Sequence, residues 1–365
     1  MYKHKISFCI VCMNRLHQLQ ETLIQNMKDN ADYDNLEFVL LNYNSQDGMH
    51  EWVTENFDEY IKKGKIAYYY TPEPQAFSHS HSKNLAFKLA SGEILCNINA
   101  DHYTGRNFAN YVNEEFVKDS NIVLTTVDYF KVKKDYNPSK DVFGKVCVKK
   151  KDFISIGGFD ERMNRYGFED WDFINRLEMI GLTRVFVENT SYLQFISHSE
   201  EERYSLKTNK NNIEGIYIRY YSPAISYVLF LYKDKTFEYG TIIDKLAKNS
   251  ACHKSAYLLG YPKFEFSITK SAKGNWWTES IDKSICYHIG EYTYYFSNKN
   301  NIAILEDKNL ELKYWLISDE QNISNLISFD YFSYNRTIME ENLERSNVVV
   351  NPSGFGISEA LGVFL

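Results

Sequence analysis

The chain reads Gly157-Gly158-Phe159-Asp160-Glu161 and, after five more residues, Gly167-Phe168-Glu169-Asp170-Trp171-Asp172-Phe173. This acidic motif joins a glycine turn to a cluster of carboxylates and runs into an amphipathic helix expected over 170–180. A general base must lie within hydrogen-bond reach of the proton it takes, and paired carboxylates at a helix start suit that task. Glu169 and Asp170 are therefore the candidate acid–base residues, although acids are also favoured there by the helix dipole alone.

Short apolar runs alternate with amphipathic stretches before this motif. Strands are expected at 6–12, 36–41, 65–70 and 93–98. This alternation is typical of an α/β domain with a mostly parallel sheet, whose ligands bind at the carboxyl ends of the strands. Beyond residue 250 the pattern changes to short alternating strands. We therefore expect a catalytic domain over 1–240 and a smaller β-rich domain over 241–365.

Composition excludes several classes of protein. The 365 residues carry a net charge of −7, which argues against nucleic acid as a partner. The longest apolar run is far short of the roughly 20 residues that cross a bilayer. Cys9 and Cys12 lie three apart in an expected strand, so they point to opposite faces and suit buried thiols in a reducing compartment. We expect a cytoplasmic protein; peripheral contact with the inner face of a membrane and self-association stay open.

Short segments rich in polar side chains follow three of the expected strands. The candidate residues in them are Met13, Asn14 and Arg15, then Tyr43, Asn44 and Asp47, and finally Asn99, Ala100 and Asp101. A carboxylate such as Asp101 can hold Mg²⁺ or Mn²⁺, which then binds the phosphates of a nucleotide diphosphate. Asp101 can equally cap the following turn. His198, at the end of another apolar run, is a second candidate ligand, although a single histidine there is more often structural.

A helix is expected to begin near residue 78 or 80. Its first turns carry His81, Lys83 and Asn84, which can face phosphate groups with the help of the positive helix end. His79 and His81 imitate a metal-binding pair, but we assign them to the entry of this helix. Trp171 suits either a core anchor or a plate on which a sugar ring stacks.

Together these segments resemble the bacterial glycosyltransferases of family 2, in particular the galactosyltransferase-like and chondroitin-polymerase-like branch. The matching elements are Met13-Asn14-Arg15, the turn at 42–47, the run at 83–93, Asn99-Ala100-Asp101 and the acidic motif, over about residues 5–200. The resemblance implies the GT-A nucleotide-diphospho-sugar transferase fold. It also implies an inverting hexosyltransferase that uses a nucleotide-sugar donor, most simply a UDP-sugar, and a polysaccharide, lipid-linked or glycoprotein acceptor.

The same resemblance assigns roles to single residues. A divalent metal, Mn²⁺ or Mg²⁺, would be held by Asp101, His198 and Asn99, and Asp170 would be the base. Glu169, Trp171 and Gly158 would bind the acceptor. The donor would contact Met13, Asn14, Arg15, Tyr43, Asn44, Asp47, His81, Lys83, Asn84, Asn99 and Ala100. Asn99 departs from the family pattern because it stands where the first aspartate of the metal motif is expected.

Two other functions fit parts of the sequence. A sugar-phosphate nucleotidyltransferase shares the sheet architecture, but it needs a glycine-rich phosphate loop after the first strand, and residues 12–15 contain no glycine. The second alternative is a degenerate transferase that serves as a glycan-binding or scaffold protein. In such a protein, Asn99 would stand in place of an aspartate because catalysis has been lost. The retention of Asp101, Glu169, Asp170 and His198 favours the enzyme.

Overall fold

The computed structural model describes residues 2–126, 144–197, 212–222, 225–243, 268–280, 284–289, 291–299, 302–307 and 310–362. The chain forms two compact units. One comprises Met1–Leu206 together with Tyr334–Leu365, and the other comprises Lys207–Ser333. The second unit is thus inserted into the first, and these bounds differ from the expected domains 1–240 and 241–365. His198 lies outside the described residues.

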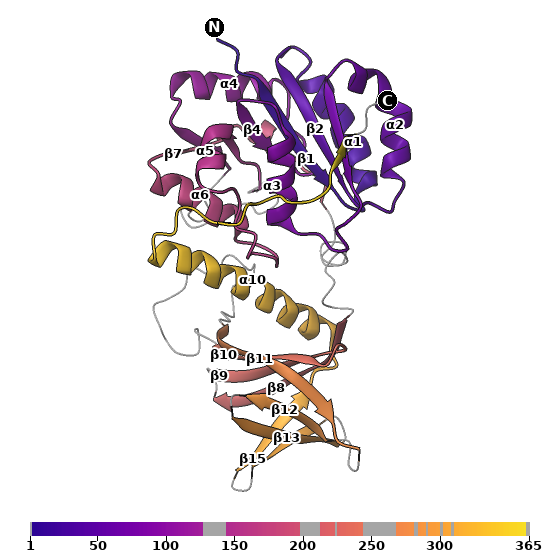
Figure 1. Cartoon of the computed structure of the whole chain (residues 1–365), viewed down its shortest axis with the longest axis vertical. Helices are drawn as coiled ribbons and strands as arrows, with labels where there is room; N and C mark the ends of the chain where they lie inside the picture. Colours follow the sequence, from indigo (N-terminus) through magenta and orange to yellow (C-terminus); the bar gives the residue numbers. More distant parts are fainter. Residues whose placement is uncertain are drawn as a thin grey trace. The chain divides into compact units, whose positions relative to one another are not determined.

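An eight-stranded sheet runs through the first unit, in the order β16-β3-β2-β1-β4-β6-β5-β7. Figure 1 shows β1 beside β2 and β4 in this sheet. Its strands are β1 (Ile6–Cys12), β2 (Leu36–Tyr43), β3 (Ile66–Thr71), β4 (Ile94–Asn97), β5 (Ile122–Thr125), β6 (Cys147–Lys149), β7 (Thr183–Phe186) and β16 (Leu361–Gly362). β1 pairs in parallel with β2 and β4, and β2 with β3. Only β6 and β16 run against their neighbours in this sheet. The expected mostly parallel sheet is confirmed.

Helices cover both faces of this sheet. They are α1 (Leu16–Asp29), α2 (Met49–Lys62), α3 (His79–Leu89), α4 (Phe108–Lys118), α5 (Lys150–Ser155) and α6 (Glu169–Met179). Successive residues of β1 enter different apolar clusters, because side chains alternate along a strand. Cys12 packs with residues of α1, α2 and α4, whereas Cys9 packs with residues of α3, α5 and α6. Both cysteines are buried free thiols, as expected.

The second unit is a closed antiparallel barrel in the order β10-β11-β12-β13-β14-β15-β8-β9. Its strands are β8 (Ile213–Ser222), β9 (Ile225–Tyr232), β10 (Thr236–Ile243), β11 (Ile268–Thr278), β12 (Ile285–Ile289), β13 (Tyr292–Lys299), β14 (Ile302–Asp307) and β15 (Leu310–Leu316). Its apolar cluster is rich in aromatic rings, among them Phe237, Tyr287, Phe296 and Tyr314. The expected change to a β-rich pattern is confirmed.

The long helix α10 (Glu320–Glu344) follows the barrel in the sequence and was not expected. The chain then returns through the first unit and ends as β16, which pairs with β3. Close contacts hold this returning segment: the Val350 N–H donates to Ile156 O, and Lys88 Nζ donates to Phe355 O. None of the helices in the described part of the chain has the length and apolarity that a bilayer span requires.

Candidate active site

The acidic pair opens helix α6. Gly167 and Phe168, which precede it, both have positive φ, at 86° and 65°. Glycine adopts this region freely, but phenylalanine rarely does, so the turn is strained. The turn brings Glu169 and Asp170 into the first positions of the helix, where the helix dipole favours negative charge. Both side chains are buried, with Asp170 7% exposed.

Lys83 lies between the two carboxylates. Its Nζ donates to Asp170 Oδ1 at 2.7 Å and to Glu169 Oε1 at 3.0 Å. Burial acts to lower the pKa of Lys83, but the charges of the two acids outweigh it and raise the pKa above its usual value. Lys83 therefore stays protonated, as one cation shared by two acids. The sequence had assigned Lys83 to the donor. The structure shows it in contact with the candidate base, and its contact with a donor stays a prediction.

The two carboxyl groups differ in their affinity for a proton. Burial raises the pKa of Asp170 to about 6; Glu169 adds to this effect, and Lys83 opposes it. Burial also acts to raise the pKa of Glu169, but the charges of Lys83 and His79 bring it below its usual value. Neighbouring acids with such divergent pKa values can take separate roles, and a base that titrates just below neutral pH is well matched to its task.

Asn99 and Asp170 meet at Gly144. A Cβ atom added to Gly144 would lie 3.1 Å from Asn99 Nδ2 and 3.4 Å from Asp170 Oδ2. Asn97 fixes this arrangement, because its Nδ2 donates to Gly144 O at 2.6 Å and to Asn99 Oδ1 at 3.1 Å. Asn99 in the loop after β4 and Asp170 at the start of α6 are 71 positions apart in the sequence, yet they share one small space. Sequence reasoning missed Gly144, because nothing around it forms a motif.

Asp101 lies beside His102 in the loop after β4. Its Oδ1 is 3.6 Å from His102 Nε2, which in turn lies 3.4 Å from Asn99 Nδ2. His102 was not among the predicted residues. Residues 194–196 run alongside this loop: the Ile196 N–H donates to Asp101 O, and Phe195 forms an isolated bridge with His102. This segment ends close in sequence to His198, whose own position is not described.

The oxygen donors after β4 suit a hard cation. Among the described residues, no cluster of three or more His, Cys, Asp or Glu side chains could hold a metal ion. The described donors are the carboxylate of Asp101 and the amide oxygen of Asn99. Mg²⁺ typically uses one or two carboxylates together with substrate phosphates. The residues present therefore fit a cation of that kind, with phosphate oxygens completing its shell.

The loops after β1 and β2 hold each other in place. Asn14 and Asn44 both adopt the left-handed conformation, which asparagine tolerates well. The Asn14 N–H donates to Ser45 Oγ at 2.7 Å, and the Gln46 N–H donates to Asn14 Oδ1 at 2.7 Å. Asp47 accepts from the Leu16 N–H at the start of α1. These contacts define the rim where the donor is expected.

The other predicted donor residues flank that rim. Met13 and Ala100 are buried, and Arg15 Nη1 donates to Asn14 O. The Tyr43 hydroxyl lies 2.7 Å from His81 Nδ1, whose Nε2 lies 3.2 Å from Ile357 O in the returning C-terminal segment. Contact of these residues with a donor stays a prediction.

Asn84, Gly158 and Trp171 lie in packed surroundings. Asn84 Nδ2 donates to Phe159 O, and Asn84 Oδ1 accepts from the Phe159 N–H. Gly158 has φ 70°, and a Cβ atom there would overlap Asn84 Oδ1. Trp171 is 8% exposed, with the Arg184 guanidinium 5.8 Å from its ring centroid. Asn84 thus holds the glycine turn of the acidic motif, and the burial of Trp171 favours the core anchor.

Residues 7–181 match the model of glycosyl transferase family 2. The matched segment contains the loops after β1, β2 and β4 and the acidic motif. Residues 7–181 are thus similar to this family, and the first unit is an α/β domain with a GT-A-like, mostly parallel sheet. No curated protein matches the chain.

Several solved structures are similar to part or most of the chain. The mannosyltransferase PcManGT from Pyrobaculum calidifontis, solved with GDP-Man and Mn²⁺, is 20% identical over 52% of this chain and 56% of that one, with a TM-score of 0.42. S. aureus TarS 1-349 with UDP is 16% identical over 55% of this chain and 63% of that one, with a TM-score of 0.43. GalNAc-T7 with UDP, GalNAc and Mn²⁺ is 14% identical over 87% and 80%, also with a TM-score of 0.43. The alignments span less than two thirds of the first two proteins.

Proposed function

We propose that the protein is a metal-dependent inverting glycosyltransferase. It moves a sugar from a nucleotide-diphospho-sugar, most simply a UDP-sugar, to a hydroxyl of a glycan, lipid-linked or glycoprotein acceptor. Asp170 carries this proposal: it is a buried carboxylate at a helix start, its pKa is raised to about 6, and it shares the space at Gly144 with Asn99. The family match over residues 7–181 supports it.

Asp170 acts as the base of this reaction. It accepts the proton of the acceptor hydroxyl while the hydroxyl oxygen bonds to the anomeric carbon of the donor. The bond from that carbon to the donor's phosphate oxygen breaks, and its electron pair leaves with the nucleoside diphosphate. Attack from the face opposite the leaving group inverts the anomeric centre. A positioned base of this kind contributes about 10²–10⁴-fold in rate.

The positive charge of Lys83 favours the ionised form of Asp170, which is the form that can accept a proton. Without its charge, the burial of Asp170 and the neighbouring Glu169 would favour the protonated acid, which cannot accept a proton. Glu169 is left to orient the acceptor. Its Oε1 contacts Lys83, whereas its buried Oε2 has no hydrogen-bond partner among the described residues. A sugar hydroxyl donated to Oε2 would satisfy that oxygen.

Asp101 and Asn99 would hold the metal, with His198 as a third ligand from the sequence. A divalent cation there supplies Lewis-acid stabilisation of the departing diphosphate. Asn99 contributes no charge, so this site binds the cation less tightly than a pair of aspartates would before the phosphates arrive. We therefore expect UDP and the metal to bind together.

The test is calorimetric titration of UDP with and without Mn²⁺, followed by a screen of nucleotide-sugars for hydrolysis. Asp170→Asn should abolish turnover and leave UDP affinity within about twofold, because the amide keeps the shape of the side chain but not its basicity. Asp119→Asn, the same change at an exposed position, is the matched control. Turnover by Asp170→Asn at the wild-type rate would remove Asp170 from the role of base.

The alternative function is that of a degenerate transferase that binds glycans without turnover. The amide at Asn99 favours it, since this position lacks the charge expected of a metal motif. The two functions separate in the same experiments. Binding of oligosaccharides without metal-dependent UDP binding or donor hydrolysis would select the alternative.

A further inference from the structure

The second half of α10 lies against the acidic motif, although it follows the whole barrel in the sequence. Tyr334–Leu365 belongs to the same compact unit as Met1–Leu206. Asn335 and Asn342 are 0% and 1% exposed. They stand seven residues apart on one helix, so they project from the same face. Buried amides of this kind persist only where their donors and acceptors are satisfied.

Asn335 binds the turn that precedes α6. Its Nδ2 donates to Gly167 O at 2.7 Å and to Arg165 O at 2.8 Å, and its Oδ1 accepts from the Arg165 N–H at 3.3 Å. Both amide hydrogens and the oxygen are thereby used. The carbonyl of Gly167 belongs to the strained turn that places Glu169 and Asp170 in the first positions of α6. This side chain therefore fixes the backbone immediately before the carboxylate pair.

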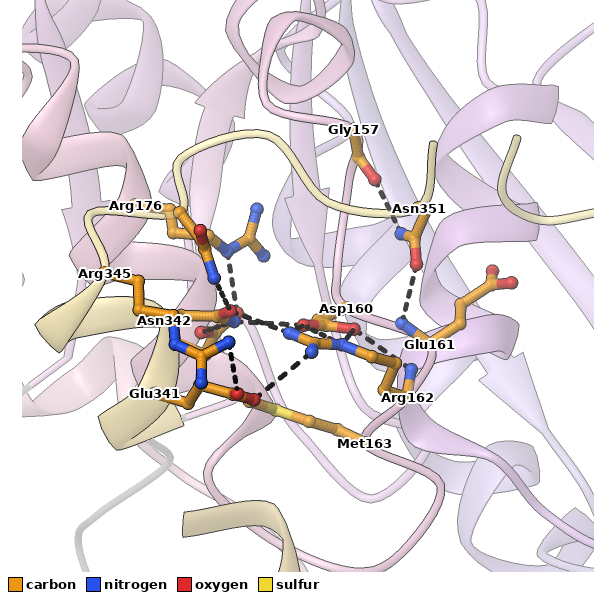
Figure 2. A network of polar contacts seen from close by, with 12 residues as sticks. Gly157, Asp160, Glu161, Arg162, Met163, Arg176, Glu341, Asn342, Arg345 and Asn351 are labelled. Carbon is orange, nitrogen blue, oxygen red and sulfur yellow. Dashed lines mark hydrogen bonds and ion pairs between the residues drawn. The ribbon is translucent and has the colours of Figure 1, made fainter. Parts of the chain in front are cut away.

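Asn342 bridges two buried acids on either side of that turn. Its Nδ2 donates to Asp172 Oδ1 at 2.8 Å and to Asp160 Oδ2 at 3.0 Å. Its Oδ1 accepts from Arg162 Nη2 at 2.7 Å, and Figure 2 shows Asn342 together with Asp160 and Arg162. Arg162 also binds Asp160, and Arg176 binds Asp172 at 2.7 Å. Arg162 and Arg176 are thus paired with Asp160 and Asp172, and the neutral amide of Asn342 joins these two ion pairs into one network.

We propose that Asn335 and Asn342 are positioning residues for the Glu169–Asp170 pair, a role that rests on the proposed transferase function. One residue holds the chain two positions before Glu169, and the other holds α6 at Asp172, two positions after Asp170. Neither touches the reacting atoms. Together they bracket the base from both sides, and misplacement of a catalytic group by about 1 Å can cost on the order of 10²-fold in rate.

The network explains why these positions are asparagine. An aspartate at 342 would lose both donated bonds and bring a third carboxylate against Asp160 and Asp172, a like-charge contact that a buried site opposes. An alanine would leave two buried carboxylate oxygens with one partner fewer, which costs roughly 1–3 kcal/mol for each unsatisfied group. At 335, alanine would release the carbonyls of Arg165 and Gly167.

The test compares full-length Asn335→Ala and Asn342→Ala with Asn113→Ala. Asn113 is a matched control, because it is also buried and makes three hydrogen bonds, to His4 N–H, Tyr33 hydroxyl and Tyr2 O. We expect kcat for donor hydrolysis to fall at least about tenfold in the two positioning variants, toward the order of 10²-fold. KM for the donor should stay within twofold, and Asn113→Ala should keep the wild-type kcat. An unchanged kcat, or an equal loss in Asn113→Ala, would overturn the proposal.

Amide hydrogen exchange gives a second readout that needs no turnover. The amides of residues 167–172 should exchange at least about tenfold faster in Asn335→Ala than in Asn113→Ala, because local opening follows the loss of the bonds that hold a turn. Equal exchange in both variants would overturn the positioning role. A wild-type protein that hydrolyses no nucleotide-sugar would refute the proposed function, and exchange would still decide the role of Asn335. Should Asn342→Ala fail to fold, Asn342→Gln keeps the amide and is expected to recover folding with reduced kcat.

Discussion

Replacing Lys83 by methionine removes a cation that contacts both buried acids while keeping a side chain of similar length. In the wild type the pKa of Asp170 is about 6, so about nine tenths of this base is ionised at pH 7. An opposite charge in contact lowers a carboxyl pKa by about 1 to 3. Loss of Lys83 should therefore reduce the ionised fraction at pH 7 to between about one half and one hundredth, and kcat should fall by about 2- to 100-fold.

The loss of kcat in Lys83→Met should be reversed at alkaline pH. At pH 9 the ionised fraction returns to about one half or more over the same range, so kcat of Lys83→Met should recover to within about twofold of the wild type. The assay is donor hydrolysis from pH 6 to pH 9. Lys118→Met, the same change on the surface of α4, should leave the pH profile unaltered.

Folding must be followed in parallel, because two buried carboxylates without their cation are costly. Breaking a buried ion pair costs about 3–5 kcal/mol, and a proton shared by the two acids will recover part of it. Thermal melts define a temperature at which both proteins are folded, and the kinetics are measured there. Equal kcat at pH 7, or a deficit that persists at pH 9, would refute the view that Lys83 controls the ionisation of Asp170.

Three further predictions concern the same unit. Because the proposed base works ionised and its pKa is about 6, kcat of the wild type should be constant above pH 7 and fall about tenfold for each pH unit below 6; a flat profile from pH 5 to 8 would exclude Asp170. Gly144→Val should place its side chain between Asn99 and Asp170, reducing kcat by at least tenfold with a melting temperature near that of the wild type, and full activity would show that this space is not used. Gly158→Ala should lower the free energy of unfolding by more than about 1 kcal/mol in urea titrations, since its φ is positive and Asn84 occupies the space; unchanged stability would contradict that packing.

The sheet could be predicted because strands such as β1, β2 and β4 are buried on both faces. Such strands appear in the sequence as continuous apolar runs, and the residues at their ends, including Asp101, are the ones that reach the rim. The helix α10 could not be predicted in the same way. Residues 320–344 mix aromatic and β-branched residues with polar ones and lack a clear apolar stripe, so they were included in the β-rich region.

The sequence predicted the acidic pair as a candidate site but not the side chains that contact it or the turn before it. Lys83 is 87 positions from Asp170, and Asn335 is 168 positions from Gly167. Helical spacing indicates that Lys83 lies near a helix start, but it cannot show which of several anionic groups the lysine will contact. Gly144 is the clearest case, because its importance comes only from the two side chains that tertiary folding brings beside it.

The insertion of the barrel has a consequence for biosynthesis. A ribosome releases the chain from its first residue onward, so the long stretch that ends at Leu206 emerges well before its partner Tyr334–Leu365 exists. Domains generally fold as units during synthesis. The barrel can therefore fold before Asn335 and Asn342 have been synthesised and can contact the earlier stretch. A nascent or truncated chain that lacks Tyr334–Leu365 therefore lacks Asn335 and Asn342. In such a chain, these two side chains do not yet hold the Glu169–Asp170 pair in place.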